Sequence, residues 1–535
     1  MAKELLCGEA LMQLLARYGV DTVFGIPGVH TLELYRGLSA TKIRHVQCRH
    51  EQGAGFMADG YARASGRPGV CVVISGPGVT NAATPLGQAF ADSVPVLCIS
   101  AVTESASLGK GWGCLHEITD QQAVTAPLTG LSATAHRPED LPELIGQAFA
   151  VFESGRPRPV HIAVPIDVLE IPVEGGWATR TPPSRPQPDP ARIAAAAEIL
   201  SRAERPTLLL GGGAVDAGDA ASKLAERLAA SVIATNAGKG VVPDNHPLSL
   251  SGCLLSPSAR DHLGEADVVL VVGSELAETD SFVERLPLNG RLIRLDIDPR
   301  KINDLYPPEV GIVADARAGL EALLSALPGD PDPARRAARE AELAAVRERI
   351  VADFTPVERK HAKVWQALRA VLPADTAIWG DITQIVYTGA AAFPVDQART
   401  WSYPAGFCTL GCGLPMAIGA KCAQPRRPMI AVAGDGGFLF TLQELAAAVE
   451  EELPLPILLW NNDGLQQIRG DMRDRNIPPI GVNPMNPDYV ALARAFGCEA
   501  LRAESAEQLQ EAMTTALETP KPTLIEVRED SAWLS

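Results

Sequence analysis

The sequence has no long uninterrupted hydrophobic run, and this lack limits where the protein can reside. Its longest apolar runs, at 207–214 and 267–273, are far shorter than the ~20 residues that a membrane-spanning helix needs. Residues 1–20 have the pattern of an amphipathic helix that ends at Gly19, without the continuous apolar core and small-residue cleavage site of a signal peptide. We therefore expect a soluble cytoplasmic protein with no membrane partner.

The ten cysteines include no CxxC pair, and most of them lie in apolar surroundings. Such cysteines are typically buried thiols, so neither a disulfide framework nor a cysteine metal site is expected. Positive charge is also scarce, because Lys and Arg total 47 against 64 Asp and Glu, for a formal net charge of −17. Nucleic-acid binding depends on clustered cationic side chains, so DNA and RNA are not expected as partners.

The rest of the composition is that of a folded α/β protein with about three domains. Short apolar, β-branched segments alternate with helical patterns along the chain, which is typical of open parallel sheets. Two proline-rich segments interrupt this alternation, at 175–190 and 327–334, and a charged helix is predicted over 334–354. We predict domains over 1–174, 191–330 and 356–535.

The most specific motif is Gly434-Asp435-Gly436, which residues 437–460 separate from Asn461-Asn462. A strand is predicted to end at Gly434, so Asp435 projects from its end while Gly436 and Gly437 let backbone amides approach a diphosphate. The next strand delivers Asn462 to the same edge, and hard oxygen ligands of this kind suit magnesium. Alone, GDG would be an ordinary turn and NN an ordinary strand end; their spacing on paired strands favours a metal site.

A carboxylate in the first predicted domain has a similar setting. The segment RHEQGAGFMADGYAR places Glu51 at the start of a helix, directly after a strand-like segment. A carboxylate there can simply stabilise the helix through the helix dipole. Two turns in the same domain, FGIPG at 24–28 and SGPGVTN at 75–81, bring backbone close to a ligand, and their presence favours a functional role for Glu51.

Together these motifs resemble those of the thiamine-diphosphate-dependent acetolactate synthase and 2-oxo acid decarboxylase superfamily. The resemblance covers essentially the whole chain and implies three open parallel-sheet domains: pyrimidine-binding, central Rossmann-like and diphosphate-binding. It implies thiamine diphosphate (ThDP) and Mg²⁺ as cofactors, with Asp435, Asn462 and the carbonyl of Gly464 as metal ligands. It places the cofactor against Pro27, Gly28, Gly76, Asn81, Thr383, Gln384, Cys408, Leu410, Gly434, Gly436, Gly437 and Asn462.

The resemblance also implies individual roles. Glu51 would hydrogen-bond N1′ of the aminopyrimidine, so that the cofactor's own 4′-nitrogen acts as a base. Leu410 would force the bent shape of ThDP, and the carbonyl of Cys408 would hold the 4′-amino group. Because Glu51 and Asp435 would act on one cofactor from different subunits, we expect a homodimer as the minimal unit, with active sites at the subunit interface, and a homotetramer as the assembly. The intact motifs argue against a catalytically silent protein.

The reactions of this superfamily begin with decarboxylation of a 2-oxo acid and differ in what traps the product. A proton gives an aldehyde, a second 2-oxo acid gives an acetohydroxy acid, and oxidation requires flavin. Acetolactate synthases carry an arginine-rich segment near FAD, commonly GxRFDDR, whereas this chain reads GSELAET at 273–279, so FAD is not expected. The segments FGIPGVHTLELYRGL and LHEITDQ also resemble 5-guanidino-2-oxopentanoate decarboxylases.

We therefore predict non-oxidative decarboxylation of a 2-oxo acid to an aldehyde, with a basic acid such as 5-guanidino-2-oxopentanoate as the candidate substrate. The alternative is an acetolactate synthase-like carboligase that joins two 2-oxo acids without functional FAD.

Three residues are candidate substrate contacts. Asp471 stands where the synthases carry a pocket tryptophan, and its carboxylate, like those of Glu275 or Glu278, can pair with a cationic substrate end. The alternative for Asp471 is that its carboxylate is a solvated surface charge. His116 can supply the proton that completes an aldehyde, although a lone histidine is more often structural. Gln121 is a further candidate for the pocket.

Overall fold

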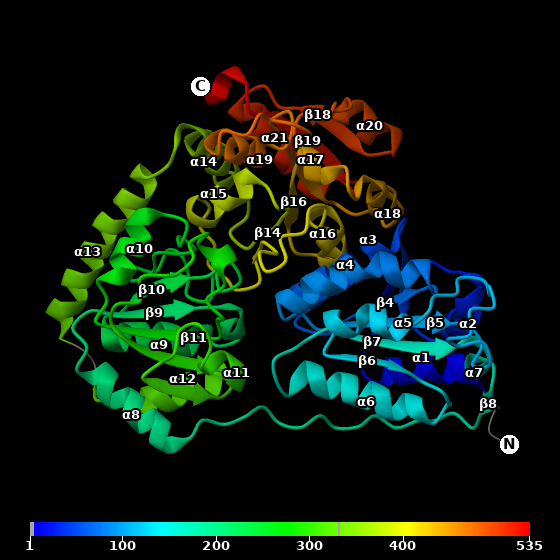
Figure 1. Ribbon diagram of the computed structural model, residues 1–535. Helices are drawn as coiled ribbons and strands as arrows, with labels where there is room; N and C mark the ends of the chain where they lie inside the picture. The colour runs from blue at the N-terminus through cyan, green and yellow to red at the C-terminus, as the bar shows by residue number, and fades with distance from the viewer. Residues whose placement is uncertain (1–4, 330–331) are drawn as a thin grey trace.

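The computed structural model describes residues 5–329 and 332–535 and has three α/β domains, as predicted. Each domain is built on a parallel sheet covered by helices (Figure 1). The first domain, blue to cyan, lies at the lower right, the green central domain at the left, and the yellow-to-red third domain at the top. The three sheets fall inside 1–174, 191–330 and 356–535, while the domain limits themselves stay predictions.

The first domain has a sheet with the strand order β3-β2-β4-β5-β7-β6. Its strands are β2 Thr22–Gly25, β3 Arg44–Gln47, β4 Gly69–Val73, β5 Val96–Val102, β6 Leu131–Thr134 and β7 Val160–Pro165. Its helices are α1 Cys7–Arg17, η1 Val29–Thr31, α2 Leu32–Ser39, α3 Glu51–Ser65, α4 Pro77–Ala91, α5 Gln121–Thr125, η2 Ala126–Leu128, α6 Asp140–Glu153 and α7 Ile166–Leu169.

The predicted N-terminal helix is shorter than expected. Strand β1 (Leu5–Leu6) pairs antiparallel with β8 (Pro172–Val173), and this pairing holds the two leucines extended, so that helix α1 begins only at Cys7. Residues 1–4, which the prediction included, lie outside the described residues. The helix ends at Arg17, and Gly19 follows with a φ of +84°, which suits a turn after a helix.

The central domain has the order β10-β9-β11-β12-β13. Its strands are β9 Pro206–Leu210, β10 Ser231–Ala234, β11 Val268–Val272, β12 Arg291–Asp296 and β13 Val310–Val313. Its helices are α8 Pro190–Ser201, η3 Gly212–Ala214, α9 Gly218–Leu228, α10 Pro257–Gly264, η4 Glu278–Asp280, α11 Pro299–Ile302, α12 Ala316–Ala326 and α13 Pro333–Ala352.

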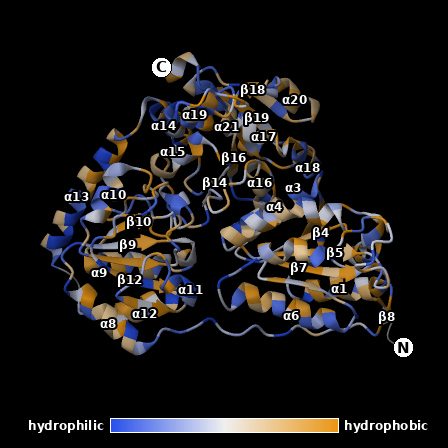
Figure 2. Ribbon diagram, in the orientation of Figure 1, coloured by the Kyte–Doolittle hydropathy of each residue, from blue (hydrophilic) through white to orange (hydrophobic). Residues whose placement is uncertain are grey.

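Both predicted connections behave largely as expected. Residues 174–189 contain no helix or strand and run as a hydrophilic chain along the lower edge of the molecule (Figures 1 and 2). The charged segment forms α13, as predicted. The second proline-rich segment precedes it, but residues 330 and 331 of that segment lie outside the described residues.

The third domain has the order β15-β14-β16-β17-β19-β18. Its strands are β14 Ala377–Gly380, β15 Trp401–Ser402, β16 Met429–Gly434, β17 Pro456–Asn461, β18 Glu499–Arg502 and β19 Thr523–Arg528. Its helices are α14 Pro356–Arg369, α15 Gln384–Ala392, α16 Gly413–Ala423, α17 Asp435–Phe438, η5 Leu442–Glu444, α18 Leu445–Glu450, α19 Gln466–Asp474, α20 Tyr489–Ala495, α21 Ala506–Glu518 and η6 Ala532–Leu534.

The first and third domains share one topology. Numbering the strands within each domain by chain order, both sheets read 2-1-3-4-6-5, and the central sheet begins the same way as 2-1-3-4-5. In doubly wound sheets a ligand binds outside the carboxyl ends of strands 1 and 3, where the strand order reverses. The chain therefore contains three such crevices, one in each domain.

The first and third domains also share a hydrophobic core. One cluster of buried side chains includes Phe56 and Met57 on α3 as well as Met416 and Ile418 on α16. The central domain has a separate core around β9, β11 and α12. In Figure 2 the buried strands carry hydrophobic colouring. Eight of the ten cysteines are buried free thiols, and Cys114 and Cys408 are partly exposed, which largely confirms the prediction for this residue type.

The contact between α3 and α16 is made by backbone. A Cβ atom at Gly60 would lie 2.0 Å from the carbonyl oxygen of Met416, and one at Gly419 would lie 1.9 Å from the carbonyl oxygen of Met57. Both glycines are therefore required for the two helices to lie this close. Among the described residues, no helix has the length and apolar character to cross a membrane.

Replacement of Gly60 by alanine should lower the stability of the whole chain. The added methyl group overlaps backbone that cannot move aside, so we expect a loss of about 3 kcal/mol and a lower melting temperature, measured by calorimetry. Gly470→Ala is the matched control, because Gly470 lies in α19 with no atom within 4 Å of its Cβ position. The control should be neutral or gain up to about 1 kcal/mol. Equal effects of the two substitutions would contradict the proposed packing.

Candidate active site

The crevice of the third domain gathers three oxygen atoms. The side-chain oxygen of Asn462 lies 3.2 Å from Asp435 Oδ1 and 2.9 Å from the carbonyl oxygen of Gly464. About 3 Å separates neighbouring ligands of an octahedral magnesium ion, so this end of the Asn462 amide, Asp435 Oδ1 and the Gly464 carbonyl are spaced as such ligands would be. Without a cation, the amide of Asn462 would turn so that its nitrogen donates to both oxygens. The donor set of three hard oxygens fits magnesium.

Two residues that the sequence did not indicate hold Asp435. Asn486 Nδ2 donates a hydrogen bond of 2.7 Å to Asp435 Oδ2, and the hydroxyl of Tyr489 donates to the Asp435 carbonyl. The backbone N–H of Gly464 also donates to Oδ2. Burial raises the pKa of Asp435 above its ordinary value, although these hydrogen bonds oppose the shift. A buried carboxylate with a raised pKa gains stability from a bound cation.

Glycines let neighbouring side chains pack close to the backbone beside Asp435, at the start of helix α17. A Cβ atom at Gly434 would lie 2.7 Å from Thr383 Oγ1, and one at Gly436 would lie 2.9 Å from Leu465. Thr383 precedes α15, and the side-chain oxygen of Gln384 accepts a hydrogen bond of 3.3 Å from Asn462 Nδ2. The structure thus brings Thr383 and Gln384 to the same crevice as Asp435 and Asn462.

The loop before α16 carries the residues predicted to shape the cofactor. Cys408 has a φ of +52°, and Leu410 lies against Gly437. Asp381, which follows β14, accepts hydrogen bonds from the N–H groups of Gly411 and Gly413 at 3.0 and 3.2 Å. Burial raises the pKa of Asp381 to about 6. Asp381 therefore ties this loop to the edge of the sheet.

The crevice of the first domain contains the second carboxylate. Asn81 Nδ2 donates a hydrogen bond of 3.0 Å to Glu51 Oε2, which joins the starts of helices α3 and α4. Pro27 and Gly28 follow β2, and Gly76 precedes α4 with a φ of +57°. The first-domain residues predicted from FGIPG, SGPGVTN and Glu51 therefore meet at one sheet edge.

His116 lies next to this edge and has a partner that the sequence did not indicate. Its ring packs edge-on against His30, with centroids 5.4 Å apart, and its carbonyl oxygen would lie 2.3 Å from a Cβ atom at Gly76. His30 Nδ1 shares a hydrogen bond of 2.5 Å with Ser75 Oγ. Burial lowers the pKa of His30, and the neighbouring His116 lowers it further. The two histidines form a pair in the crevice.

Gln121, predicted as a substrate contact, makes hydrogen bonds within the first domain. Its side-chain oxygen accepts a hydrogen bond from Gly76 N at 2.8 Å, and its amide nitrogen donates to Ser100 Oγ and the Ala101 carbonyl. These bonds use both N–H donors of a fully buried amide. Gln121 instead fixes the position of Gly76. Asp471 lies on α19, where its carboxylate accepts a hydrogen bond from Gln467 at 3.2 Å.

Glu444 links the third domain to the first. Its buried carboxylate accepts hydrogen bonds from the backbone N–H of Arg49 at 3.1 and 3.2 Å, two residues before Glu51. A Cβ atom at Gly53 would lie 2.2 Å from this carboxylate, so α3 needs glycine there. Burial raises the pKa of Glu444 to about 7, and the negative charge of Glu51 adds to the rise. No motif in the sequence pointed to this contact.

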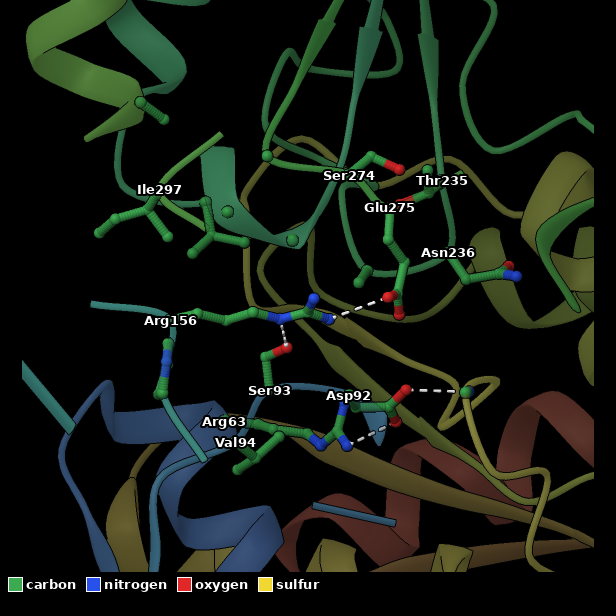
Figure 3. A pocket seen from close by; sticks show the side chains of 18 of the residues that line it. Arg63, Asp92, Ser93, Val94, Arg156, Thr235, Asn236, Ser274, Glu275 and Ile297 are labelled. Carbon is green, nitrogen blue, oxygen red and sulfur yellow. Dashed lines mark hydrogen bonds and ion pairs between the residues drawn. The ribbon is translucent and has the colours of Figure 1, made fainter. Parts of the chain in front are cut away.

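The crevice of the central domain opens into a cavity of about 310 Å³ between the three domains (Figure 3). Glu275, in the segment where the arginines are missing, points across it to Arg156 at 3.2 Å and also pairs with Lys301 at 2.8 Å. Burial opposes ionisation of Glu275, but these two cations hold its pKa below its ordinary value. Its charge is therefore already neutralised within the chain, which argues against its predicted pairing with a substrate.

The arrangement is that of an enzyme with two crevices. In one crevice a carboxylate lies beside an amide, and in the other hard oxygens lie beside glycines. Three protein-family domains match the chain, in the order of its first, central and third domains. Residues 7–124 match "Thiamine pyrophosphate enzyme, N-terminal TPP binding domain", residues 193–323 the central domain, and residues 381–527 the C-terminal TPP binding domain.

Known proteins similar to the chain agree with this. It is 54% identical to "Probable 2-ketoarginine decarboxylase AruI" of Pseudomonas aeruginosa, over 99% of this chain and 95% of that protein. It is 32% identical to the acetolactate synthase isozyme 1 large subunit of Escherichia coli, over 98% and 94%. It is 32% identical to a probable acetolactate synthase large subunit of Methanocaldococcus jannaschii, over 98% and 92%.

The chain therefore belongs to the thiamine pyrophosphate enzyme family, which confirms the resemblance found in the sequence. Its relatives are named as decarboxylases and acetolactate synthases, so the prediction of an enzyme that uses thiamine diphosphate is confirmed as well.

The raised pKa of Glu444 predicts a pH-dependent stability. The native state holds this proton more tightly than the unfolded chain, whose ordinary pKa is 4.5. The stabilising contribution is thus complete below about pH 4.5 and is lost as the pH rises to about 7. Glu444→Gln should make the melting temperature depend less steeply on pH between 4.5 and 7. Glu450→Gln, which removes an exposed partner of Arg49, should leave that slope unchanged. An unaltered slope in Glu444→Gln would refute the assignment.

Proposed function

We propose that the protein is a ThDP- and magnesium-dependent decarboxylase that converts a 2-oxo acid to an aldehyde, with a basic acid such as 5-guanidino-2-oxopentanoate as substrate. The observation that carries this proposal is that the segment 273–279 contains no arginine, and that its Glu275 pairs with Arg156. With no free arginine there, the chain lacks the group that would bind a second acid. The 54% identity to a probable 2-ketoarginine decarboxylase supports the same choice.

The third-domain crevice would bind the diphosphate and the metal. Asp435, Asn462 and the carbonyl of Gly464 would hold magnesium, and Gly436 and Gly437 would let backbone amides approach the phosphate oxygens at the start of α17. Bound ThDP supplies the carbon nucleophile and accepts the electron pair released as CO₂ leaves. Leu410, held against Gly437 beside a loop tied by Asp381, would fix the bend of the cofactor.

The residues of the first-domain crevice would hold and transfer protons. The Glu51 carboxylate, oriented by Asn81, would hold a proton at the ring nitrogen of the aminopyrimidine. His116 would supply the proton that completes the aldehyde, and His30, bonded to Ser75, would keep His116 oriented by packing against its ring.

We propose that two copies of the chain form each active site. Among the described residues, no hydrogen bond or ion pair joins the Glu51–Asn81 pair to the Asp435 cluster of the same chain. Large apolar side chains are exposed beside both crevices, which is typical of surfaces covered by a partner. They include Val29, Leu32, Trp112, Leu115, Phe407, Phe440, Ile480 and Met485. A homodimer covers them, and a homotetramer is the proposed assembly.

The alternative is an acetolactate synthase-like carboligase without FAD. The 31–33% identity to several acetolactate synthase large subunits is the finding that favours it. The absence of FAD and the cytoplasmic location stay predictions.

Replacement of Glu51 by Gln should remove activity but not binding. An amide cannot exchange a proton with the aminopyrimidine, so we expect kcat to fall by about 100- to 10,000-fold, measured as aldehyde release. Magnesium-dependent ThDP binding, followed by tryptophan fluorescence, should persist. Glu153→Gln, at the exposed end of α6, is the control for loss of one carboxylate in the same domain. Full activity of Glu51→Gln would overturn the proposed role.

Product analysis under single-turnover conditions distinguishes the two reactions. The enzyme with ThDP and magnesium is offered pyruvate, 5-guanidino-2-oxopentanoate and a neutral long-chain 2-oxo acid in parallel. We expect rapid release of 4-guanidinobutyraldehyde, and loss of that product when magnesium is removed by a chelator. Acetolactate formed from pyruvate would instead identify a carboligase that needs no free arginine at 273–279.

A further inference from the structure

The cavity between the three domains lies at the crevice of the central sheet. Gly212 and Gly213 follow β9, Asn236 follows β10, and Gly273 and Ser274 follow β11, so the loops after neighbouring strands line it together (Figure 3). Crevices at this place in doubly wound sheets bind ligands. Its far wall belongs to the third domain and includes Tyr403, Ala405 and Gly406, immediately before Cys408. The cavity therefore reaches the loop that is proposed to hold the cofactor.

Carboxylates outnumber cations in this cavity. Six carboxylates and four guanidinium groups line it, without lysine or histidine. Each guanidinium has a carboxylate partner at 2.7–3.2 Å: the pairs are Arg63–Asp92, Arg156–Glu275, Arg185–Asp315 and Arg399–Asp216. Among the described residues, Asp280 and Asp296 form no ion pair. The lining of the cavity therefore carries more carboxylates than cationic side chains.

Asp280 is the unpaired carboxylate nearer to the cofactor loop. Burial raises its pKa to about 6 in spite of hydrogen bonds from Asn236, and the negative charges of Asp92 and Glu275 raise it further. Burial also raises the pKa of the Cys408 thiol, and Asp280 contributes to that shift through its charge. Asp280 lines the same cavity as Tyr403, Ala405 and Gly406, which directly precede the loop of Cys408.

One oxygen of Asp280 is free to bind a ligand. Asn236 donates from its backbone N–H at 3.0 Å and from Nδ2 at 3.1 Å, both to Oδ1, so Oδ2 accepts no hydrogen bond from a described residue. Positive φ angles at Leu276 and Phe282 bound this turn and fix its course. The carboxylate is held in place by one oxygen and offers the other to the cavity.

We propose that Asp280 binds the guanidinium end of the 2-oxo acid, in the part of the cavity next to Cys408. This assignment rests on the proposed function and names the residue that selects a basic substrate. A charge-assisted hydrogen bond to a partly desolvated carboxylate is stronger than one between neutral groups, and a partly buried carboxylate without a cationic partner disfavours a substrate that has no cation to offer. Asp471 and Glu275 lack this combination, since Asp471 lies on a helix without buried residues and Glu275 is already paired.

The test compares two substrates in the holoenzyme of wild type and Asp280→Asn. With 5-guanidino-2-oxopentanoate we expect kcat/KM to fall by about 10- to 100-fold in the variant, through KM more than kcat. With the neutral 2-oxohexanoate kcat/KM should hold or rise, because the unpaired charge is gone. Asp216→Asn is the matched control: it removes a carboxylate of the same cavity that is already paired with Arg399, and it should leave the ratio of the two substrates unchanged.

The pH profile gives a readout that a purely structural role would not move. Only the ionised carboxylate binds a cation, so the preference of wild type for the guanidino acid should decline as the pH falls below about 6, and the variant should lack this decline. The groups facing Asp280 are Asp92, Glu275, Tyr403 and Cys408, of which both carboxylates are ion-paired.

Three outcomes would overturn the assignment, and they differ from one another. Equal losses for both substrates would make Asp280 a structural residue, and no loss for either would exclude contact with the substrate. If wild type released an aldehyde from neither acid, the proposed function itself would fail, and the assignment with it.

Discussion

The close contact of α3 with α16 is the constraint on which the arrangement of the two crevices depends. The two helices touch through Gly60 and Gly419, and their side chains belong to one core that runs through both domains. Helix α3 begins at Glu51, and α16 begins at Gly413, directly after the loop of Cys408 and Leu410. One backbone contact therefore fixes the first-domain crevice relative to the third-domain crevice of the same chain, and in the proposed dimer these two crevices contribute to two different active sites. Glu444 strengthens this coupling, because it reaches from the third domain to the residues just before Glu51.

The shared strand order explains why polar residues far apart in the sequence serve the same purpose. In each sheet the chain turns back between strands 1 and 3, and the loops after these strands face one crevice. Gly28 and Gly76 occupy these positions in the first domain, and Thr383 and Asp435 occupy them in the third. The two crevices lie at the same place in their sheets but contain different groups. The first-domain crevice contains a carboxylate with an amide, and the third-domain crevice contains hard oxygens with glycines.

Local motifs were sufficient to predict the parts of the site that are close in sequence or on adjacent strands. Asp435 and Asn462 follow the paired strands β16 and β17, so their spacing already implied that they meet. Glu444, His30, Asn486 and Asp280 escaped notice because their partners come from other elements, and nothing in a single sequence reports such distances. The hydrogen bonds of Gln121 were hidden for the same reason. A side-chain amide looks free in a sequence, and only the three-dimensional structure reveals that Gly76, Ser100 and Ala101 already use it.

The segment 273–279 contains no arginine, and the central cavity has more carboxylates than cations in its lining. Buried carboxylates need either a partner or a proton. Glu275 has partners in Arg156 and Lys301, so its ionised form is stable there. Among the described residues Asp280 has no cationic partner, only hydrogen bonds from Asn236, and burial raises its pKa to about 6. A cationic ligand would neutralise the ionised form of Asp280, whereas an anionic ligand would add to the excess of negative charge in the cavity. The same pattern of charges that disfavours a second 2-oxo acid in this cavity thus supports the proposal of a substrate that is positively charged at one end.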